Sequence, residues 1–417
     1  MERLVDAVLM ENVVAGDHAV GAEQVTEISE EGRGLLVGQP SLLVHEPDGN
    51  VRPTRGRRSV MRAGVFRGVR QMPVEDVPDP TPGPRDIVLE VKACGICGSD
   101  LHGYVAGQFS AVGQVMGHEF SGEVVHVGED VAGIALGDRV TGPPIQPCGE
   151  CGPCRAGSGH LCEVWTERSI AFGLPGAFAE RVRIPEAVIG GNVHRLPDDL
   201  DFEDGAFVEP LAVATHAVGR ADVEPEDVAV VLGLGTIGLL VAQVLMARGL
   251  TRVIGVDLSP LRRSVAEELG VIATGPDGIE AAAAGSDIDV VFEATGAPPL
   301  VQRAMELVRA GGTVVVIALY EQRAEIDPTT AVQKELTVRG SAIFTPEEFR
   351  EALDLLASGA VRVQPLITHR HALEDLGEAF EAQLDKDAAI KVMVSPAPEP
   401  ADVRSVTAVD IPARHPA

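Results

Sequence analysis

Two groups of residues in this sequence could bind metal ions, and their donor atoms differ. The first group begins with Cys97, shortly before His102, and continues with the pair His118 and Glu119. The second group consists of four cysteines, Cys148, Cys151, Cys154 and Cys162. Four thiolates can close a tetrahedral zinc site, whereas mixed sulfur, nitrogen and oxygen donors are typical of a zinc ion that keeps one position open for chemistry. A closed and an open site in one chain indicate an enzyme.

The four cysteines predict a structural zinc lobe over residues 148–162. Two residues separate each of the first three cysteines, seven precede the fourth, and glycines lie between them. Such a site contributes roughly 10–16 kcal/mol of apparent binding energy that is coupled to folding. The alternative, a secreted disulfide framework, is disfavoured by the chain length, the opening residues, which lack the order of a signal peptide, and the regular spacing.

A third motif predicts a dinucleotide site. The run from Gly233 to Gly238 has the form G-x-G-x-x-G, with Gly235 in the middle, and Thr236 and Ile237 complete it. It follows an apolar run of strand type and opens a helical one, which makes the signal strong. The three glycines permit the tight turn, the close approach of the pyrophosphate and the packing of helix on strand, while the helix amino terminus offers free N–H groups.

The acidic residue that completes this motif is Asp257, nineteen residues after the last glycine. Its carboxylate is expected to accept hydrogen bonds from the adenosine ribose and to repel a 2′-phosphate, which favours NAD over NADP. Arg262, a further cofactor-binding candidate, and Arg263 lie close by and leave NADP open. The plain alternative is a glycine-rich turn in a parallel sheet that binds no cofactor.

The elements that must position these residues change in type near Val213. Short strands before this point, at 63–66 and 87–91, lead into the Cys97 run. Strands then alternate with helices, which implies right-handed crossovers and a parallel sheet. The strands are expected at 228–232, 252–256, 289–292 and 313–318, and the helices at 237–248, 262–269 and 300–309. Helices at 346–358 and 374–383 and a strand at 390–394 follow.

Length and charge narrow the class of protein. The chain has 417 residues and a mass of 43.7 kDa, so two domains are expected. Hydrophobic residues make up 45% of the sequence and charged residues 23%, a composition that is ordinary for a soluble globular protein. The formal net charge of −28 argues against nucleic acid and anionic membranes as partners. The most apolar run, 228–246, contains the glycine motif and is better explained by it than by a membrane span. A cytoplasmic location is expected.

From residue 61 to about 396, these motifs and their order resemble the medium-chain, zinc-dependent alcohol dehydrogenases. Glu209-Pro210-Leu211 is similar to the sorbitol, butanediol and threonine dehydrogenase branch, in which Glu replaces the second cysteine ligand. The stretches 347–353 and 390–396 look most like butanediol dehydrogenases.

The resemblance implies roles for the first group. Cys97 and His118 are the firm ligands of a catalytic zinc ion, and Glu119 and Glu209 share the remaining protein contact. For Glu209 the plain alternative is a solvated loop acid. Asp100 resembles a carboxylate that orients His118, an arrangement that zinc sites commonly use.

The resemblance also implies a proton relay and a cofactor pocket. The relay residues follow Cys97, and the pocket residues follow the last clear strand of the sheet. Ser99 and His102 would pass the substrate proton toward solvent, although an isolated His102 is more often an ordinary surface histidine. Ile317 and Leu319 resemble the segment that lines the nicotinamide. Cys94 matches no ligand and is expected to be a small buried residue.

The resemblance implies an α/β enzyme that transfers hydride between a secondary alcohol, such as a vicinal diol or polyol, and NAD, with two zinc ions per chain. A mostly-β GroES-like catalytic domain spans 61–212 and 345–396, and a Rossmann domain with a doubly wound parallel sheet spans 213–344. Residues 1–60 are expected to be a flexible extension, and residues 397–417 a disordered tail. The partners are the small-molecule alcohol and ketone and further copies of the chain, in a dimer or tetramer. Alternatives are an amino-alcohol oxidiser similar to L-threonine 3-dehydrogenase, and a silent NAD-binding protein with structural zinc only.

Overall fold

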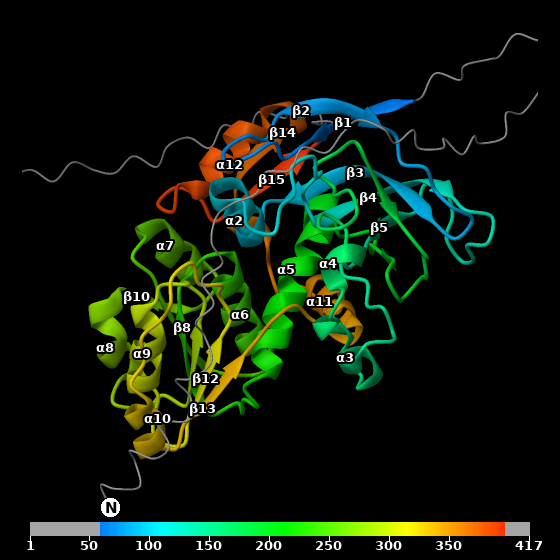
Figure 1. Cartoon of the computed structure of the whole chain (residues 1–417). Helices are drawn as coiled ribbons and strands as arrows, with labels where there is room; N and C mark the ends of the chain where they lie inside the picture. The colour runs from blue at the N-terminus through cyan, green and yellow to red at the C-terminus, as the bar shows by residue number, and fades with distance from the viewer. Residues whose placement is uncertain (1–58, 397–417) are drawn as a thin grey trace, which may run out of the picture. The chain divides into compact units, whose positions relative to one another are not determined.

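Residues 59–396 are described by the structure, a computed structural model (Figure 1). The expected extension and tail lie outside this range, except for residues 59 and 60. Strand β1 begins at Val60, so it starts one residue before the predicted domain boundary. The observed strand β1, Val60–Gly64, thus lies closer to the N-terminus than the strand predicted at 63–66. It pairs with a strand at Val74–Pro78 that was not predicted.

A six-stranded sheet within the described residues is parallel throughout and has the order β10-β9-β8-β11-β12-β13. Its strands are β8 (Val228–Leu232), β9 (Arg252–Val256), β10 (Ile272–Thr274), β11 (Val290–Glu293), β12 (Thr313–Val316) and β13 (Thr337–Gly340). This is the strand order of a Rossmann fold, and the order reverses between β8 and β11. The prediction of a doubly wound parallel sheet is confirmed, and two of its strands, β8 and β9, have the predicted bounds.

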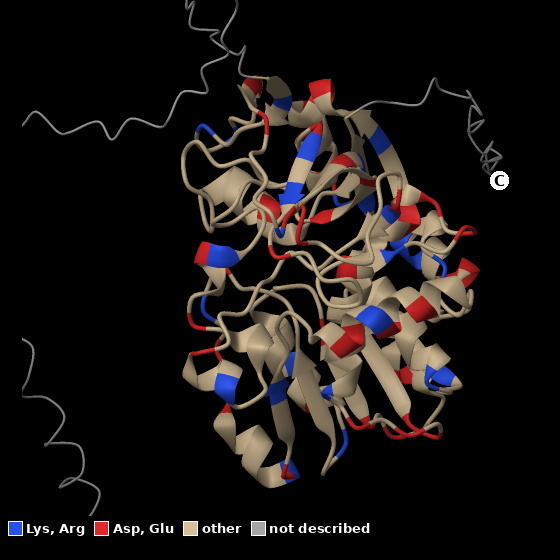
Figure 2. Cartoon of the chain, turned by 90° about the vertical axis from the view of Figure 1, so that its right-hand side faces the viewer, with Lys and Arg blue, Asp and Glu red and all other residues tan. Residues whose placement is uncertain are grey.

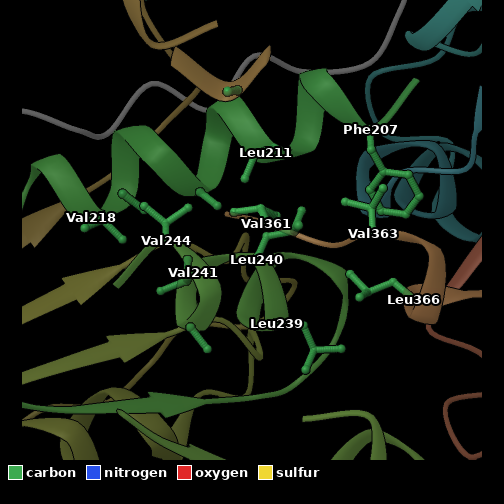
Figure 3. Close-up of a cluster of buried hydrophobic side chains, with 14 of the residues drawn as sticks. Phe207, Leu211, Val218, Leu239, Leu240, Val241, Val244, Val361, Val363 and Leu366 are labelled. Atoms are coloured by element: carbon green, nitrogen blue, oxygen red, sulfur yellow. The ribbon is translucent and has the colours of Figure 1, made fainter. Parts of the chain in front are cut away.

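Both faces of this sheet are buried, which explains why its strands read as continuous apolar runs. On β8, Ala229 and Val231 pack into one hydrophobic cluster, and Val230 and Leu232 pack into another on the opposite face. The first cluster joins the sheet to helices α5 (Phe202–Gly219) and α6 (Thr236–Ala247), whose facing side chains are drawn in Figure 3. The second cluster lies under helices α8 (Ile279–Ala283) and α9 (Pro299–Leu307).

A second sheet, mostly antiparallel, has the order β14-β15-β3-β4-β5-β7, and β6 pairs with β3. Its strands are β3 (Ile87–Gly95), β4 (Glu119–Val127), β5 (Arg139–Thr141), β6 (Arg181–Ile184), β7 (His194–Arg195), β14 (Ile367–Ala372) and β15 (Lys391–Ser395). A separate hairpin is formed by β1 (Val60–Gly64) and β2 (Val74–Pro78). Since β15 pairs with β3, the end of the described chain completes the sheet begun near its start, as blue and red strands in Figure 1 show.

Helices connect and cover these sheets. They are α2 (Gly98–Ala106), α3 (Gly152–Arg155), α4 (Trp165–Arg168), α5 (Phe202–Gly219), α6 (Thr236–Ala247), α7 (Pro260–Glu268), α8 (Ile279–Ala283), α9 (Pro299–Leu307), α10 (Pro328–Lys334), α11 (Pro346–Ala357) and α12 (Leu376–Leu384). Four short 3-10 turns, at 159–161, 276–278, 364–366 and 373–375, complete the description.

Helix α5 matters most for function because it packs against β3 and β4 on one side and against α6 and α11 on the other. It begins with a capping box, in which Asp201 and Asp204 each accept a hydrogen bond from the other's backbone N–H. Pro210 lies inside the helix, where its missing N–H leaves one carbonyl without the usual partner. The predicted boundary between residues 212 and 213 falls within this helix rather than in a linker.

The surface and hydropathy of the described residues fit the composition. In the view of Figure 2, acidic and basic residues are interspersed over the elements. No helix between residues 59 and 396 combines the length and apolar character that crossing a bilayer requires.

Candidate metal and dinucleotide sites

The four cysteines of the predicted lobe lie together. Their sulfur atoms are all within 4.8 Å of one another, which no other group of three or more Cys, His, Asp and Glu residues achieves between 59 and 396. Cys151 caps the short helix α3, and Cys162 follows the turn at 159–161. All six cysteines fall within the described residues, and none is in a disulfide. The four-thiol set fits a tetrahedral zinc ion.

The backbone of the lobe already favours charged sulfur at one position. The Cys148 sulfur accepts N–H groups of Glu150 and Cys151 at 3.4 and 3.3 Å. These bonds lower the pKa of Cys148 to about 6. Burial, followed by the neighbouring Cys151 thiol, raises the pKa of Cys154 to about 12. Four thiols this close cannot all ionise without a cation, and a divalent metal would supply that charge.

A histidine from the lobe contacts helix α5. The rings of His160 and His216 are 5.0 Å apart and edge to face. The Nδ1 atom of His216 is 2.9 Å from the Glu348 carboxylate on α11. Burial, together with His216, lowers the pKa of His160, which favours its neutral form. The sequence assigned these histidines no role, and the structure shows that they join the lobe to the helix that carries Glu209.

Cys97 lies where strand β3 ends and helix α2 begins. Its backbone N–H donates to the Asp100 carboxylate at 3.0 Å, which fixes the start of the helix. Burial, followed by the charges of Glu119 and Asp100, raises the pKa of Cys97 to about 12. Cys94, on β3, is fully buried, as predicted.

His118 directly precedes β4, and its position depends on a glycine. Gly117 has a φ of 91°, and a Cβ there would lie 2.7 Å from the backbone nitrogen of Phe178. The Nδ1 atom of His118 is buried without a hydrogen-bond partner and is 3.6 Å from Asp100. Its other ring nitrogen is 3.5 Å from the Ser99 hydroxyl. The carboxylate is thus on the side predicted for orienting the ring, at a distance slightly longer than a hydrogen bond.

Glu209 is buried on α5, so the alternative of a solvated loop acid is wrong. Burial raises the pKa of Glu209 to about 8, with opposing effects from His118 and further increases from Glu119 and Cys97. The charges of Cys97, His118 and Glu119 thus all act on the Glu209 carboxyl group, as expected if the four predicted ligands lie near one another. Their donor atoms are nevertheless less tightly gathered than those of the lobe.

Glu119, the first residue of β4, is bound to a lysine. The Nζ atom of Lys391 donates to the Glu119 carboxylate at 2.6 Å and to the Ile96 carbonyl at 3.0 Å. Both partners of this ion pair are buried. Gly95 makes room for it, because a Cβ there would meet the Glu119 carboxylate. Lys391 was not predicted, although a single lysine in the apolar run 390–394 is an available signal.

The donor set in this region fits a divalent metal ion. The imidazole of His118 and the carboxyl group of Glu209 are buried, and the thiol of Cys97 is half-buried. Loss of solvent is the first cause of the raised pKa values of Cys97 and Glu209. Such groups are costly to charge unless a cation accompanies them. The orphaned Nδ1 of His118 faces Asp100, and the opposite nitrogen has only a long contact of 3.5 Å with the Ser99 hydroxyl, so it could bind a metal instead.

The two relay candidates lie on helix α2. Ser99 is next to His118, as described above, and His102 follows one turn later with a 21% exposed side chain. His102 lies 3.2 Å from the carboxylate of Glu321, a residue without a predicted role.

The glycine fingerprint has the expected close packing. Gly233 has a φ of 92°, and a Cβ there would lie 2.7 Å from Thr295. A Cβ on Gly238 would lie 1.8 Å from the Gly233 carbonyl, so helix α6 can approach only because this residue is glycine. Gly235 caps α6, and nothing but Arg262, 3.9 Å away, lies near its missing Cβ. Space next to the helix amino terminus is therefore open for a phosphate.

The next two residues of the fingerprint are partly buried. The hydroxyl of Thr236 donates to the Ile390 carbonyl at 2.9 Å, and Ile237 packs against the large hydrophobic cluster. Both therefore help to fix α6 against its surroundings.

Asp257 follows β9 and is held by the backbone. Its carboxylate accepts the N–H groups of Leu234 and Ser259, each at 2.8 Å. Arg262 lies 3.7 Å from this carboxylate and donates to the Ala389 carbonyl at 3.0 Å. The acidic residue is therefore fixed beside the glycine turn, with one arginine close to it.

The segment after β12 reaches the same edge of the sheet. Ile317 is partly buried and donates its N–H to the Glu293 carbonyl at 2.9 Å, and Leu319 is 56% exposed. Gly296 presses on this segment, since a Cβ there would lie 2.7 Å from the Leu319 carbonyl. Both predicted nicotinamide residues are thus at the carboxyl edge, near the fingerprint.

Comparisons with known proteins agree with this geometry. Residues 83–198 match the family described as the alcohol dehydrogenase GroES-like domain, and residues 236–358 match zinc-binding dehydrogenase. The chain is 37% identical to (R,R)-butanediol dehydrogenase from Bacillus subtilis over 359 residues, covering 81% of this chain and all of that protein. It is 34% identical to sorbitol dehydrogenase from Halalkalibacterium halodurans, covering 79% of this chain and 97% of that protein.

A solved structure is similar in fold as well. The zinc-binding dehydrogenase from Sinorhizobium meliloti, bound to NADP, has a TM-score of 0.75 and 36% identity, covering 81% of this chain and all of that one.

Proposed function

This chain belongs to the zinc-binding alcohol dehydrogenases, and we propose that it oxidises secondary alcohols, of the vicinal diol or polyol class, with NAD. The observation that carries this proposal is the set of half-buried Cys97 with buried His118 and Glu209, which combines a thiol, an imidazole and a carboxyl group. The similarity to butanediol and sorbitol dehydrogenases supports the class of substrate. Membership in this family of enzymes also disfavours a silent nucleotide-binding protein.

Two zinc ions per chain are proposed, one in the cysteine lobe and one held by Cys97, His118 and Glu209. The second ion, when bound, supplies Lewis acidity to the substrate oxygen, which makes hydride loss from the adjacent carbon easier. The protein holds the imidazole of His118 between Asp100 and the metal position. The lobe contributes stability rather than chemistry.

The ion pair assigns different roles to the two glutamates. Lys391 holds the carboxylate of Glu119 at 2.6 Å, whereas no lysine between residues 59 and 396 forms an ion pair with Glu209. We therefore propose Glu209 as the resting ligand. Glu119 with Lys391 forms a neutral pair beside it, and Glu119 would be able to bind the ion only if this bond were broken.

The proposed proton path uses Ser99 and His102. The Ser99 hydroxyl can receive the substrate proton because it lies 3.5 Å from the ligand His118, next to the metal position. His102 is one turn further along α2, partly exposed, and can release the proton to solvent.

The dinucleotide is proposed to bind at the carboxyl edge of the parallel sheet. The open amino terminus of α6 is suited to the pyrophosphate, and Ile317 and Leu319 would lie against the nicotinamide. The fixed carboxylate of Asp257 favours NAD, while the NADP bound to the Sinorhizobium protein shows why both cofactors must be tested.

We further propose that the chain forms a homo-oligomer. Strand β13 is an edge of its sheet, and Val338 on it is 47% exposed. Val332 and Ile326 nearby in the sequence are 74% and 49% exposed. Apolar side chains beside an unpaired edge are suited to burial against a second copy. Sedimentation velocity of the full chain tests this, and a monomer would refute it.

Metal analysis with a substrate screen tests the enzyme proposal. Two zinc ions per chain and NAD-linked oxidation of 2,3-butanediol or sorbitol, faster than that of threonine and simple secondary alcohols, are expected. Preference for threonine would favour the amino-alcohol alternative. One zinc ion per chain without turnover of any alcohol would refute the proposal.

A further inference from the structure

Glu293 at the end of β11 is a buried carboxylate with three hydrogen bonds. It accepts the backbone N–H of Thr295 at 2.8 Å, and it also accepts the Thr295 and Tyr320 hydroxyl groups. Its side chain is fully buried. Thr295 is the residue against which Gly233 of the fingerprint packs. Tyr320 therefore ties the segment after β12 to the glycine turn.

Glu321, the residue after Tyr320, contacts a histidine of helix α2. The carboxylate of Glu321 lies 3.2 Å from Nδ1 of His102 on α2. That nitrogen is shielded from solvent and has no aligned hydrogen-bond partner among the described residues. The distance is within the hydrogen-bond range, and only the alignment falls short. A small rotation of either side chain would complete the bond.

We propose that Glu321 is a positioning residue for His102, held in place by the Tyr320–Glu293 bond, and that it fixes His102 as the tautomer protonated at Nδ1. This inference rests on the proposed role of His102 in the proton path. In a neutral histidine one ring nitrogen donates and the other accepts, and the bond made by one decides the state of the other. With Nδ1–H directed at Glu321, Nε2 is free to accept the proton.

The bond between Tyr320 and Glu293, which anchors this segment, explains why an exposed acid such as Glu321 can position His102. The side chain of Glu321 is 56% exposed, so by itself it would lose conformational freedom on binding His102. Its neighbour Tyr320 already fixes the backbone through Glu293. The pKa of Tyr320 is raised, first by burial and then by its bond to Glu293, so the phenol keeps the proton that it donates. The segment carrying Ile317 and Leu319 is thereby connected to both the cofactor region and the proton path.

The test is the protonation state of His102, read by ¹⁵N nuclear magnetic resonance on the full chain with labelled histidine, assigned through a His102→Gln variant. The native chain is expected to show Nδ1–H, and Glu321→Ala to shift His102 toward the Nε2–H form. Glu321→Gln, which keeps an acceptor, should retain more of the native signal. Glu325→Ala, at an exposed acid of the same segment, is the matched control. An unchanged His102 signal in Glu321→Ala overturns the proposal.

Kinetics provide the second measurement. Glu321→Ala should lower kcat by about 10-fold, the same size as the smallest losses seen when the partner of a metal-binding histidine is removed. In a His102→Ala background the same change should have an effect of less than about twofold, because residues that act through one another are not additive. Equal losses in both backgrounds overturn the proposal.

The spectrum of His102 and the kinetics can fail independently of each other. If the native chain oxidises no alcohol, the proposed function fails, and the tautomer measurement still decides the contact between Glu321 and His102. Tyr320→Phe tests the anchor: it should weaken the Nδ1–H signal in part. An unchanged signal would overturn the role of the Tyr320–Glu293 bond.

Discussion

The cysteine lobe and the proposed reactive site, the set of Cys97, His118, Glu119 and Glu209, both offer donor atoms suited to zinc, but they are built in different ways. The lobe takes all its donors from residues 148–162, and they lie within 4.8 Å of one another. The reactive site takes Cys97 from the end of β3, His118 from the start of β4 and Glu209 from α5. Lys391, from β15, neutralises the acid beside them.

This difference extends to the charge of each site. In the lobe, N–H groups of the same short segment lower the pKa of Cys148 to about 6. In the reactive site, burial raises the pKa of Cys97 to about 12 and that of Glu209 to about 8. A local loop can supply N–H donors for a closed structural site. The proposed open site takes its donors from separate elements of the packed protein, and there a distant lysine balances the charge of Glu119.

The largest effect on activity is expected from Cys97→Ser. It should lower kcat on the order of 10³-fold, because zinc supplies several kcal/mol and each ~1.4 kcal/mol is a factor of ten. Zinc content should fall from two ions per chain to one, with NADH binding retained in a fluorescence titration. Cys94→Ala, at a buried cysteine of the same segment, is the control that should keep both ions. Full activity of Cys97→Ser would contradict the ligand role.

The matching change in the lobe, Cys154→Ser, should act on stability instead. A structural zinc site contributes roughly 10–16 kcal/mol of binding energy coupled to folding, and loss of one thiolate should remove a large part of it. Thermal unfolding should therefore occur at lower temperature, while the activity of molecules still folded at low temperature stays close to native. A loss of kcat with unchanged unfolding would reverse the assignment of the two sites.

Lys391→Met tests whether the reactive site depends on its distant lysine. Removing one member of a buried ion pair should cost about 3–5 kcal/mol, because Glu119 remains buried without a partner. Urea unfolding measures this cost. Adding Glu119→Gln to Lys391→Met should recover part of the stability.

Arg248→Met is the control for this measurement. It removes an exposed pair with Glu351, whose side chains are 45% and 37% exposed, and such pairs contribute about 0–1 kcal/mol. Equal costs for Lys391→Met and Arg248→Met would show that the buried pair has no special weight.

The smallest effect is expected from Asp257→Ser, at a site that is local like the lobe but binds a ligand like the reactive site. Loss of the carboxylate should shift the NADP-to-NAD ratio of kcat/KM by about tenfold, equivalent to ~1.4 kcal/mol of removed repulsion. Parallel kinetics with both cofactors give this ratio. No change in it would indicate that Arg262 or other groups decide the preference.

Local patterns accounted for much of the fold. Strands β8 and β9 were predicted with their observed bounds, because short apolar runs between turn signals are typical of strands buried on both faces. The glycine motif was also predicted from the sequence. The structure gives the reason for two of its glycines: Gly233 has a positive φ, and a Cβ on Gly238 would have no room. The cysteine lobe followed from spacing alone. In each case the information lies within a few residues.

Helix α5 was not predicted, although Asp201 and Asp204 form a capping box at its start. Pro210 inside the run argues against a helix, and packing against the second sheet and against α6 and α11 outweighs that local cost. Glu209 consequently lies in a buried helix, and the predicted domain boundary lies within the same element.

The sequence by itself determined the kinds of donor atoms, the closed cysteine lobe and the glycine turn, since spacing over a few residues fixes which atoms can meet. Only the tertiary structure decided that Lys391 binds Glu119, that Tyr320 binds Glu293 and that Glu321 approaches His102. These partners are far apart in the chain, and they meet because strand pairing and helix packing bring their backbones together and bury their charges.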